Sequence, residues 1–209
     1  SGTARDGIAI RTAGALTLEG TGLHAASVTL RAAGAIGQET DALVVAGLLR
    51  ARSATGAVRL QDPLNRIGAL GDSDAATELI LGTEGTLRVT GAVAAPLVAL
   101  TAAESISQDG GTISAKTLRA VAQTRAVALA GPGNAIGALD DSGGATGFAL
   151  TTTGELQVVG DLTTGGTLSL RAGALALEGA LGGGAVQLTA TAGDLSLIHI
   201  SEPTRLRRI

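Results

Sequence analysis

Residues 81–100 read LGTEGTLRVTGAVAAPLVAL, and residues 150–170 read LTTTGELQVVGDLTTGGTLSL. Within each stretch, apolar residues alternate with polar or small ones, and glycines flank the short apolar runs. An alternation of period two between glycines is typical of short β-strands joined by tight turns. The second stretch repeats the first 69 positions later, with Leu81, Gly85, Leu87, Val89 and Gly91 corresponding to Leu150, Gly154, Leu156, Val158 and Gly160. A third, partial copy occupies residues 14–30.

The similarity extends well beyond these two stretches. VTLRAAGAIGQ at residues 28–38 matches VALTAAESISQ 70 positions later, and the segment at 49–70 matches the segment at 118–139 after 69 positions. The change of spacing requires one single-residue deletion, which a surface turn tolerates. Residues 28–97 and 98–167 are therefore two copies of one unit of about 70 residues, with partial copies on either side.

A shorter spacing of about 19–20 residues separates strand-like runs inside the unit, such as those at Ile80 and Val98. A fixed period of this size indicates a solenoid, in which each coil buries its apolar face only when neighbouring coils stack on it. The pattern of leucine-rich repeats is absent, and helical solenoids need repeats longer than about 30 residues. We therefore predict an all-β fold, a parallel β-helix with coils of about 19–20 residues.

The prediction specifies an interior. We expect ten aliphatic side chains to point inward: Leu30, Ile36, Leu60, Leu87, Val89, Leu100, Leu129, Leu156, Val158 and Leu170. Residues 61–78 and 130–147 do not divide into 19-residue coils, and we expect longer loops or irregular coils there. Both ends of the solenoid should expose open strand edges.

The composition agrees with a narrow, regular interior. The chain is 45% hydrophobic and has 32 glycines, but its only aromatic residue is Phe148, and it lacks Cys, Met, Trp and Tyr. Stacked identical layers of Leu, Val, Ile and Ala can fill such an interior without large rings. The absence of cysteine excludes disulfides, thiolate metal sites and a cysteine nucleophile. Because the chain also lacks methionine, we interpret Ser1 as an internal residue of a longer protein.

The charges suggest no nucleic-acid-binding surface. The formal net charge is −3, and the charged residues are scattered along the sequence rather than grouped. No basic stripe or aromatic platform typical of a nucleic-acid-binding protein is visible. We therefore predict no nucleic-acid partner.

Asn65 and Asn134 occupy equivalent positions in the two units, each two residues after a proline. They could bind a ligand, but a corner asparagine more often caps the backbone of its turn or stacks on an asparagine of the next coil. Acidic pairs occur at Asp72/Asp74 and Asp140/Asp141 in the same loop of each unit. Calcium needs about six to eight oxygen ligands, and these segments lack the GGxGxD repeat of calcium-binding β-rolls, so a solvated loop is the favoured interpretation.

His24 is placed by its sequence context in a turn between the LTL and VTL runs, where we expect a surface histidine, since no GxSxG-like elbow accompanies it. Glycine pairs and triplets at 110–111, 143–144, 165–166 and 182–184 lack the context of a phosphate-binding loop, and we interpret them as corners that need positive φ. No spacing selects a pair of carboxylates for glycoside cleavage. The sequence thus predicts no catalytic, cofactor-binding or metal-binding residues.

The last fifteen residues, 195–209, have no counterpart in the repeat. Residues 195–205, LSLIHISEPTR, resemble the in-frame translation of a transposon-based sequencing adapter without a mismatch. We therefore expect the natural repeat segment to comprise residues 1–194, and the tail, including His199 and the arginines at 205, 207 and 208, to be non-native.

The repeated pattern of VTLRAAGAIGQ, GNAIGAL and GFALTTTGELQVVGDLTTGGTLSL resembles the repeat region of filamentous-haemagglutinin-type adhesins over roughly residues 8–194. These are large exoproteins of Gram-negative bacteria exported by two-partner secretion. The resemblance implies a right-handed parallel β-helix shaft at the cell surface, an outer-membrane transporter as export partner, and roles in adhesion or biofilm formation. Ligands on host cells or surfaces would be bound by regions outside this segment, and no cofactor is implied.

Two other functions remain open. A β-helical polysaccharide lyase or hydrolase shares the fold, but such enzymes usually carry aromatics that stack on sugars, and this chain has Phe148 alone. An autotransporter passenger domain differs only in carrying its own C-terminal membrane barrel. The neighbouring gene sequence would separate the adhesin from the autotransporter, and an assay on acidic polysaccharides would reveal an enzyme.

Overall fold

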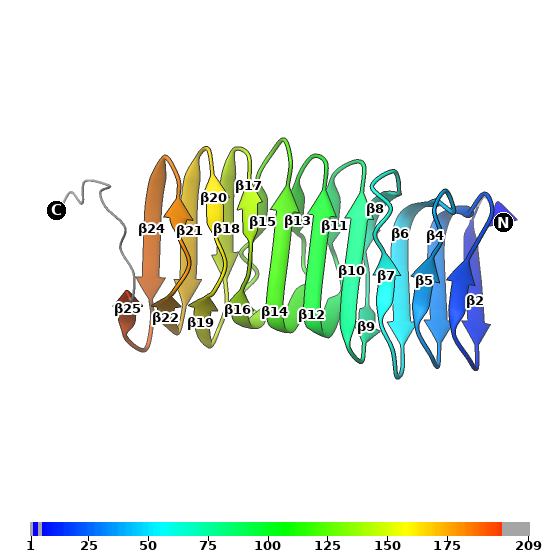
Figure 1. The fold of residues 1–209 in the computed structure, drawn as a ribbon, viewed down its shortest axis with the longest axis horizontal. Helices are drawn as coiled ribbons and strands as arrows, with labels where there is room; N and C mark the ends of the chain where they lie inside the picture. The colour runs from blue at the N-terminus through cyan, green and yellow to red at the C-terminus, as the bar shows by residue number, and fades with distance from the viewer. Residues whose placement is uncertain (1, 4–5, 198–209) are drawn as a thin grey trace.

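The computed structural model describes residues 2–3 and 6–197. In these residues the chain forms β-strands and no helix, and all of the strand pairings are parallel. The strands stack along one axis, with the first and last coils at opposite ends of an elongated solenoid (Figure 1). The prediction of a parallel β-helix is confirmed. No helix that could cross a membrane occurs in the described part of the chain.

The strands of the first half alternate between long and short before breaking into shorter pieces: β1 (Gly2–Thr3), β2 (Gly7–Thr12), β3 (Leu16–Leu18), β4 (Leu23–Ala32), β5 (Ile36–Gln38), β6 (Val44–Ser53), β7 (Val58–Leu60), β8 (Arg66–Leu70), β9 (Ser73–Ala75), β10 (Glu78–Thr83) and β11 (Leu87–Val89). The same order of lengths then recurs: β12 (Ala92–Ala102), β13 (Ile106–Gln108), β14 (Thr112–Ala122), β15 (Val127–Leu129), β16 (Ala135–Leu139), β17 (Ser142–Gly144), β18 (Gly147–Thr151) and β19 (Glu155–Val158). The last strands are β20 (Leu162–Thr164), β21 (Thr167–Ala172), β22 (Ala174–Leu177), β23 (Leu181–Gly182), β24 (Ala185–Ala190) and β25 (Leu195–Leu197).

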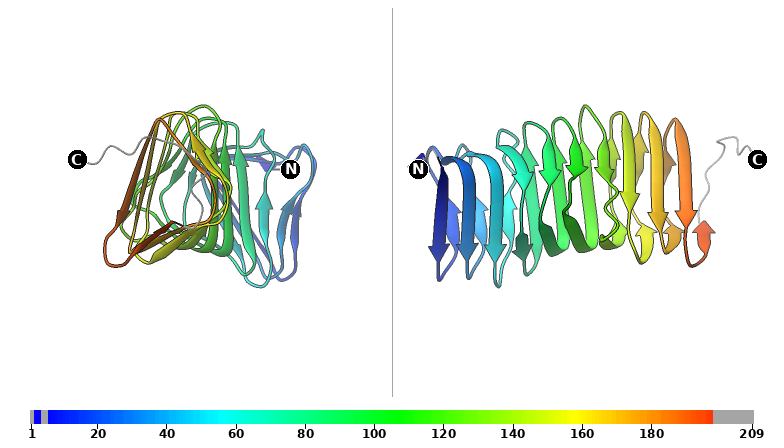
Figure 2. Two further views of the ribbon diagram at one scale, coloured as in Figure 1. Left: turned by 60° about the vertical axis from the view of Figure 1, so that its left-hand side comes forward. Right: turned by 180° about the vertical axis from the view of Figure 1, so that it is seen from behind.

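The coil has three sides, as the view in Figure 2 (left) shows. In the first coils, a long strand supplies two of these sides and a short strand supplies the third. The long strand bends at Ala26 and at the stacked position Gly47, which are skipped in the pairing between β4 and β6. A methyl group on Gly47 would lie 2.9 Å from the carbonyl oxygen of Ala26, so glycine permits the close approach at this bend.

Stacked residues measure the length of each coil. One column begins at Leu16 and continues through one residue per coil: Ile36, Val58, Leu79, Val98, Leu118, Leu139, Val158, Leu177 and Leu197. Successive members lie 19–22 residues apart, so the predicted period of 19–20 is close but somewhat short. The column has ten members, which at about 4.8 Å per coil gives a rod about 45 Å long.

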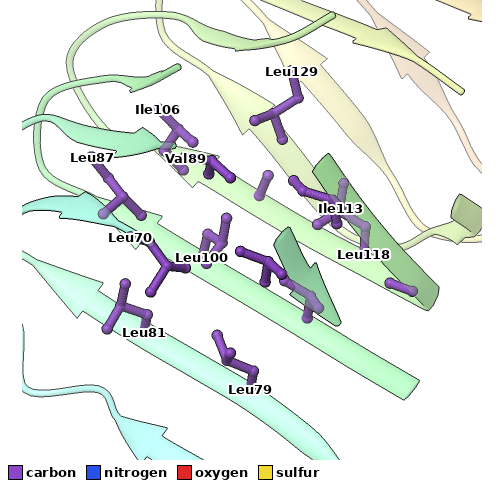
Figure 3. Close-up of a cluster of buried hydrophobic side chains, with 14 of the residues drawn as sticks. Leu70, Leu79, Leu81, Leu87, Val89, Leu100, Ile106, Ile113, Leu118 and Leu129 are labelled. Carbon is purple, nitrogen blue, oxygen red and sulfur yellow. The ribbon is translucent and has the colours of Figure 1, made fainter. Parts of the chain in front are cut away.

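The interior is a continuous stack of aliphatic side chains. All ten residues that were predicted to point inward are buried. Figure 3 shows part of this stack, in which side chains from neighbouring coils, such as Leu81, Leu100 and Val89, meet in one interior. Phe148 is also buried and takes the position that Leu79 has in the first unit. The core is thus built from period-two alternation on each strand, since every second side chain points inward.

The 70-residue unit does not correspond to a whole number of coils. Val28 stacks beneath Leu49, Leu70 and Val89, and the fourth coil brings the column to Gln108. Val98, the counterpart of Val28 in the second unit, lies nine residues after Val89 in sequence, about half a coil. One repeat therefore spans about three and a half coils.

Equivalent residues of successive repeats consequently lie on different sides of the solenoid. Val98 stacks on Leu79 and under Leu118, in a column separate from that of Val28. The column of Val28 continues to Leu170. Two repeats after Val28 the sequence reaches position 168, two residues before Leu170, so the pattern returns almost to its starting side after two repeats.

Of the two expectations for residues 61–78 and 130–147, that of long loops is wrong and that of irregular coils is confirmed. Two strands lie inside each segment, β8 and β9 in the first and β16 and β17 in the second. In each segment one side of the coil is split by a short interruption at Gly71–Asp72 or Asp140–Asp141. This interruption lengthens the coil to 22 residues between Arg52 and Asp74, and it obscures the period in the sequence.

Candidate functional site

Asn65, the first candidate ligand-binding residue, is buried in the turn between β7 and β8. Its Oδ1 accepts hydrogen bonds from Gln38 Nε2 at 2.7 Å and from the backbone N–H of Val44 at 2.8 Å. Its Nδ2 donates to Gln38 Oε1 at 3.0 Å and to the carbonyl of Leu60 at 3.2 Å. All of these partners belong to the chain itself, so Asn65 joins neighbouring coils and presents no atom to a ligand.

Asn134 has the same arrangement one repeat later. It exchanges hydrogen bonds with Gln108 at 2.8 and 2.9 Å and accepts one from the N–H of Ile113 at 2.9 Å. Its Nδ2 also donates to the carbonyls of Leu129 and Thr151. The prediction of a backbone-capping asparagine is confirmed, but the alternative in which the asparagine stacks on another asparagine is wrong, because a glutamine occupies the adjoining coil.

Two buried threonines complete these corners and were not singled out in the sequence. Thr83 Oγ1 accepts from the N–H of Ile67 at 2.9 Å and donates to the carbonyl of Asn65 at 3.0 Å. Thr152 makes the equivalent bonds with Ile136 and with Asn134. Both hydroxyls replace backbone partners where the strand pairing is interrupted. Their spacing of 69 residues was the signal that could have identified them.

Two buried serines act in the same way on another side of the coil. Ser73 Oγ accepts from the N–H of Ala51 at 3.0 Å, and Ser142 Oγ accepts from the N–H of Ala120 at 2.9 Å. Every buried side-chain nitrogen and oxygen in the described part of the chain has a hydrogen-bond partner. The repeated polar residues inside the solenoid are therefore fully used in holding coils together.

One aspartate of each acidic pair binds the backbone of the next coil. Asp72 Oδ1 accepts from the N–H of Ala92 in the next coil at 2.9 Å, and Asp141 Oδ1 accepts from the N–H of Asp161 at 3.1 Å. Asp161 in turn accepts from the N–H of Ala180 at 3.1 Å. Within residues 2–3 and 6–197, no cluster of three or more His, Cys, Asp or Glu side chains could hold a metal ion.

Four ion pairs lie on the surface of the described chain, all between an arginine and a carboxylate of the next coil: Arg52–Asp74, Arg59–Glu78, Arg66–Glu84 and Arg119–Asp141. The hydrogen bond from Arg66 to Glu84 and the charge of Glu84 raise the pKa of Arg66 above its ordinary value. Arg66 and Glu84 line an open groove of about 470 Å³ with Thr86 and Glu104. The groove lacks a histidine or an aromatic wall, and we find no catalytic arrangement in it.

His24 is exposed, as predicted, but it does not lie in a turn. It is the second residue of β4 and pairs with Val45 of β6. The turn ends one residue earlier because Gly20 and Gly22, both with positive φ, reverse the chain before the buried Leu23.

The interpretation of the glycine pairs as positive-φ corners holds only for Gly110, which has a φ of 75°. Gly143 and Gly144 lie in strand β17. At Gly166, a methyl group would lie 2.0 Å from the carbonyl oxygen of Thr146 in the preceding coil. Close stacking of neighbouring coils, rather than backbone conformation, therefore requires glycine at most of these positions.

The start of the tail continues the last coil. β25 pairs in parallel with β22, with Leu195 beside Leu175. An alternating LSL sequence is sufficient to pair with an open strand edge, so this pairing does not decide whether residues 195–209 are native. Residues 198–209, including His199 and the three arginines, lie outside the described residues.

A sequence-family profile described as repeats of unknown function (DUF5649) matches residues 5–72. The matched stretch is close in length to the 70-residue unit and agrees with a chain built from repeats. Comparisons with curated proteins and with solved structures gave no match. The chain is a β-solenoid repeat protein. Its continuous parallel ladders and single aliphatic interior fit a structural shaft.

Proposed function

We propose that this chain is a non-catalytic shaft segment of a large secreted bacterial adhesin, which holds distal binding regions away from the cell. One observation carries the proposal: the two repeats preserve the residues that build the coil and not those on its surface. The buried Val28, Asn65 and Thr83 recur as Val98, Asn134 and Thr152. A repeated binding or catalytic site would instead need repeated exposed groups.

The exposed positions show the opposite behaviour. Arg31, Arg59 and Arg88 are exposed, and their counterparts are Thr101, Ala128 and Gln157. Apart from the Arg50/Arg119 and Asp72/Asp141 positions, few exposed charged groups recur. The repeat therefore maintains a frame whose surface is free to vary, as expected of a spacer that carries other domains.

The mechanism is mechanical. Each coil is joined to the next by parallel strand pairing on three sides. The hydrogen bonds of Asn65 and Asn134 hold the corners where this pairing is interrupted. Each repeat of three and a half coils should lengthen the shaft by about 17 Å, at about 4.8 Å per coil. Insertion of a further copy of residues 28–97 should increase the maximum dimension measured by small-angle X-ray scattering by that amount.

The biological part of the proposal is tested by the DNA on either side of this coding segment. An upstream secretion domain beside a gene for an outer-membrane transporter would support a two-partner exoprotein. A downstream membrane barrel would instead indicate that the segment belongs to the passenger domain of an autotransporter. Turnover of acidic polysaccharides by the purified chain would overturn the non-catalytic shaft.

A further inference from the structure

Charged side chains in the first coils are segregated by the fold. Between residues 7 and 62, the acidic residues all lie in the turns that follow the short strands β3, β5 and β7, and these turns stack at one corner of the coil. We call them the acidic corner: Glu19, Glu39, Asp41 and Asp62. Three of the four are exposed, and Asp62 is half-buried and accepts a hydrogen bond from the N–H of Leu64.

The arginines of the same coils lie on the opposite side. Arg11, Arg31 and Arg52 are direct neighbours in the pairing of β2, β4 and β6, and Arg50 lies two residues before Arg52 on the same outer surface. We call these four residues the arginine face. They project from the part of the long strand after its bend, which is the side that faces away from the acidic corner in a three-sided coil.

The interpretation of the charges as scattered is therefore wrong for this part of the chain. Arg11, Arg31 and Arg52 are separated by 20 and 21 residues, which is the length of a coil. Residues that are distant in sequence are thus brought into adjacent strands. A scan for contiguous charged runs cannot detect such a surface.

Two arginines of the arginine face, Arg11 and Arg31, have no carboxylate partner within the described residues. Like charges directly opposite each other on neighbouring strands are unfavourable, and the strands are only about 4.8 Å apart. Arg52 pairs with Asp74, but the described residues provide no ion pair for Arg11 or Arg31. Arg11, Arg31 and Arg52 line an open groove of about 720 Å³, in which Asp74 is the one acidic residue of the lining. Carboxylates entering the groove would find guanidinium groups able to form bidentate hydrogen bonds.

We propose that the arginine face binds the acidic corner of a second copy of this chain, so that two rods associate side by side and in parallel. Both charged rows rise along the rod axis by one strand spacing per coil, because they are built on the same coils. Two copies at nearly the same height therefore bring carboxylates of one rod level with successive arginines of the other. The small side chains Ala13, Ala33 and Ala54 around the arginines allow the corner to approach.

This association is directional and does not close on itself. Each rod uses one surface as receptor and the opposite surface as ligand, which is a heterologous contact. A third rod can add in the same way, so the product is a layer of parallel rods rather than a closed dimer. The proposal concerns lateral assembly and does not depend on what the shaft carries.

The experiment is sedimentation velocity of the full chain over a range of protein concentrations. Exposed ion pairs are individually weak and are screened by salt. We expect the weight-average sedimentation coefficient to rise with protein concentration at about 10 mM salt, where the Debye length is about 30 Å, and to return to the monomer value at about 1 M salt, where it is about 3 Å.

Two charge-reversal variants make the test specific. Arg11→Glu/Arg31→Glu removes the positive surface, and Glu19→Arg/Glu39→Arg removes the acidic one. Each variant alone should remain monomeric at low salt, because its two surfaces then carry charge of the same sign, whereas an equimolar mixture of the two variants should associate. Glu155→Arg/Glu178→Arg is the matched control for the second variant, since it makes the same change in net charge at exposed acids outside these coils. It should associate like the natural sequence.

In the mixture, the acidic corner of the first variant meets the arginine face of the second, and the two reversed surfaces are also opposite in charge, so the two variants should alternate in a layer like that of the natural chain. Unchanged circular dichroism spectra would verify that the variants are folded. A natural chain that stays monomeric at low salt would overturn the proposal. So would loss of association in the control, or binding of polygalacturonate to the arginine face in a chain that shows no self-association.

Discussion

Gln108 and Asn134 exchange two side-chain hydrogen bonds between neighbouring coils, from Nε2 to Oδ1 at 2.8 Å and from Nδ2 to Oε1 at 2.9 Å. Asn134 is fully buried, and it also binds the backbone N–H of Ile113 and the carbonyl of Leu129. Gln38 and Asn65 repeat the arrangement in the first unit. This amide pair is the polar element that fixes the corner of the coil in each repeat.

Replacement of Asn134 by alanine should destabilise the chain substantially. It would leave the N–H of Ile113 and the carbonyl of Leu129 without their partner, and each buried group left unpaired costs about 1–3 kcal/mol. Urea denaturation would measure the loss. Gln157→Ala, which truncates an exposed amide on β19, should have almost no effect; equal losses in the two variants would contradict the assigned role.

Truncation of Leu100 to alanine should cost about 2–5 kcal/mol, because the stacked interior cannot collapse around the resulting cavity. Leu100 is completely buried, whereas Leu64 is 54% exposed. Leu64→Ala therefore serves as the control and should shift the thermal unfolding midpoint little. A midpoint for Leu100→Ala that matches the control would argue against the inward orientation of β12.

Gly166→Ala should destabilise the chain by about 1–3 kcal/mol, the usual cost of forcing atoms into a packed site. The added methyl group would lie 2.0 Å from the carbonyl oxygen of Thr146, whereas at Gly154 nothing lies within 4 Å. Gly154→Ala should be neutral or slightly stabilising, because alanine restricts the unfolded chain. Chemical denaturation of both variants gives the comparison, and a benign Gly166→Ala would disprove the close contact between coils.

Calcium and EDTA should leave the unfolding midpoint unchanged. The carboxylates of Asp72 and Asp141 already accept backbone hydrogen bonds, and the described residues contain no cluster of acidic groups able to surround an ion. Differential scanning fluorimetry with millimolar Ca²⁺ and with chelator is sufficient. A rise in midpoint with Ca²⁺ that saturates would reveal a site that this structure does not suggest.

A chain that ends at Asp194 should retain the unfolding midpoint of the longer chain. Leu195 is 45% exposed, and β22 is the strand with which β25 pairs among the described residues. Hydrogen exchange should quicken only near Leu175–Leu177. Resequencing of the source DNA by an amplification method without transposon adapters should find other codons after Asp194; recovery of the LSLIHISEPTR codons would refute the adapter interpretation.

The core of this fold could be predicted from the sequence because it depends on local patterns. Period-two alternation places Leu30, Leu60 and Leu100 on the interior face of their strands. This orientation does not depend on which strands pair, so the register did not have to be known. The interruptions near Asp72 and Asp141 could not be placed, because they change the coil length without changing the alternation.

The polar contacts depended on register and could not be predicted in detail. Gln38 and Asn65 are 27 residues apart, more than one coil, and their contact follows from the path of the turn between β7 and β8. The arginine face was missed for a related reason: Arg11 and Arg31 become neighbours only when the register of β2 on β4 is known.

One repeat spans about three and a half coils, so the number of repeats determines both the length of the rod and the side toward which its end faces. Recombination between the two copies would add or remove one unit of about 70 residues, and everything beyond the junction would turn by about half a revolution about the axis. A gain of two units would restore the original azimuth to within two residues, as positions 28, 168 and 170 show. Two variants that differ by an odd number of units would therefore present a terminal domain on opposite sides of the rod axis. A change in the length of the rod is thus also a change in the direction in which that domain points.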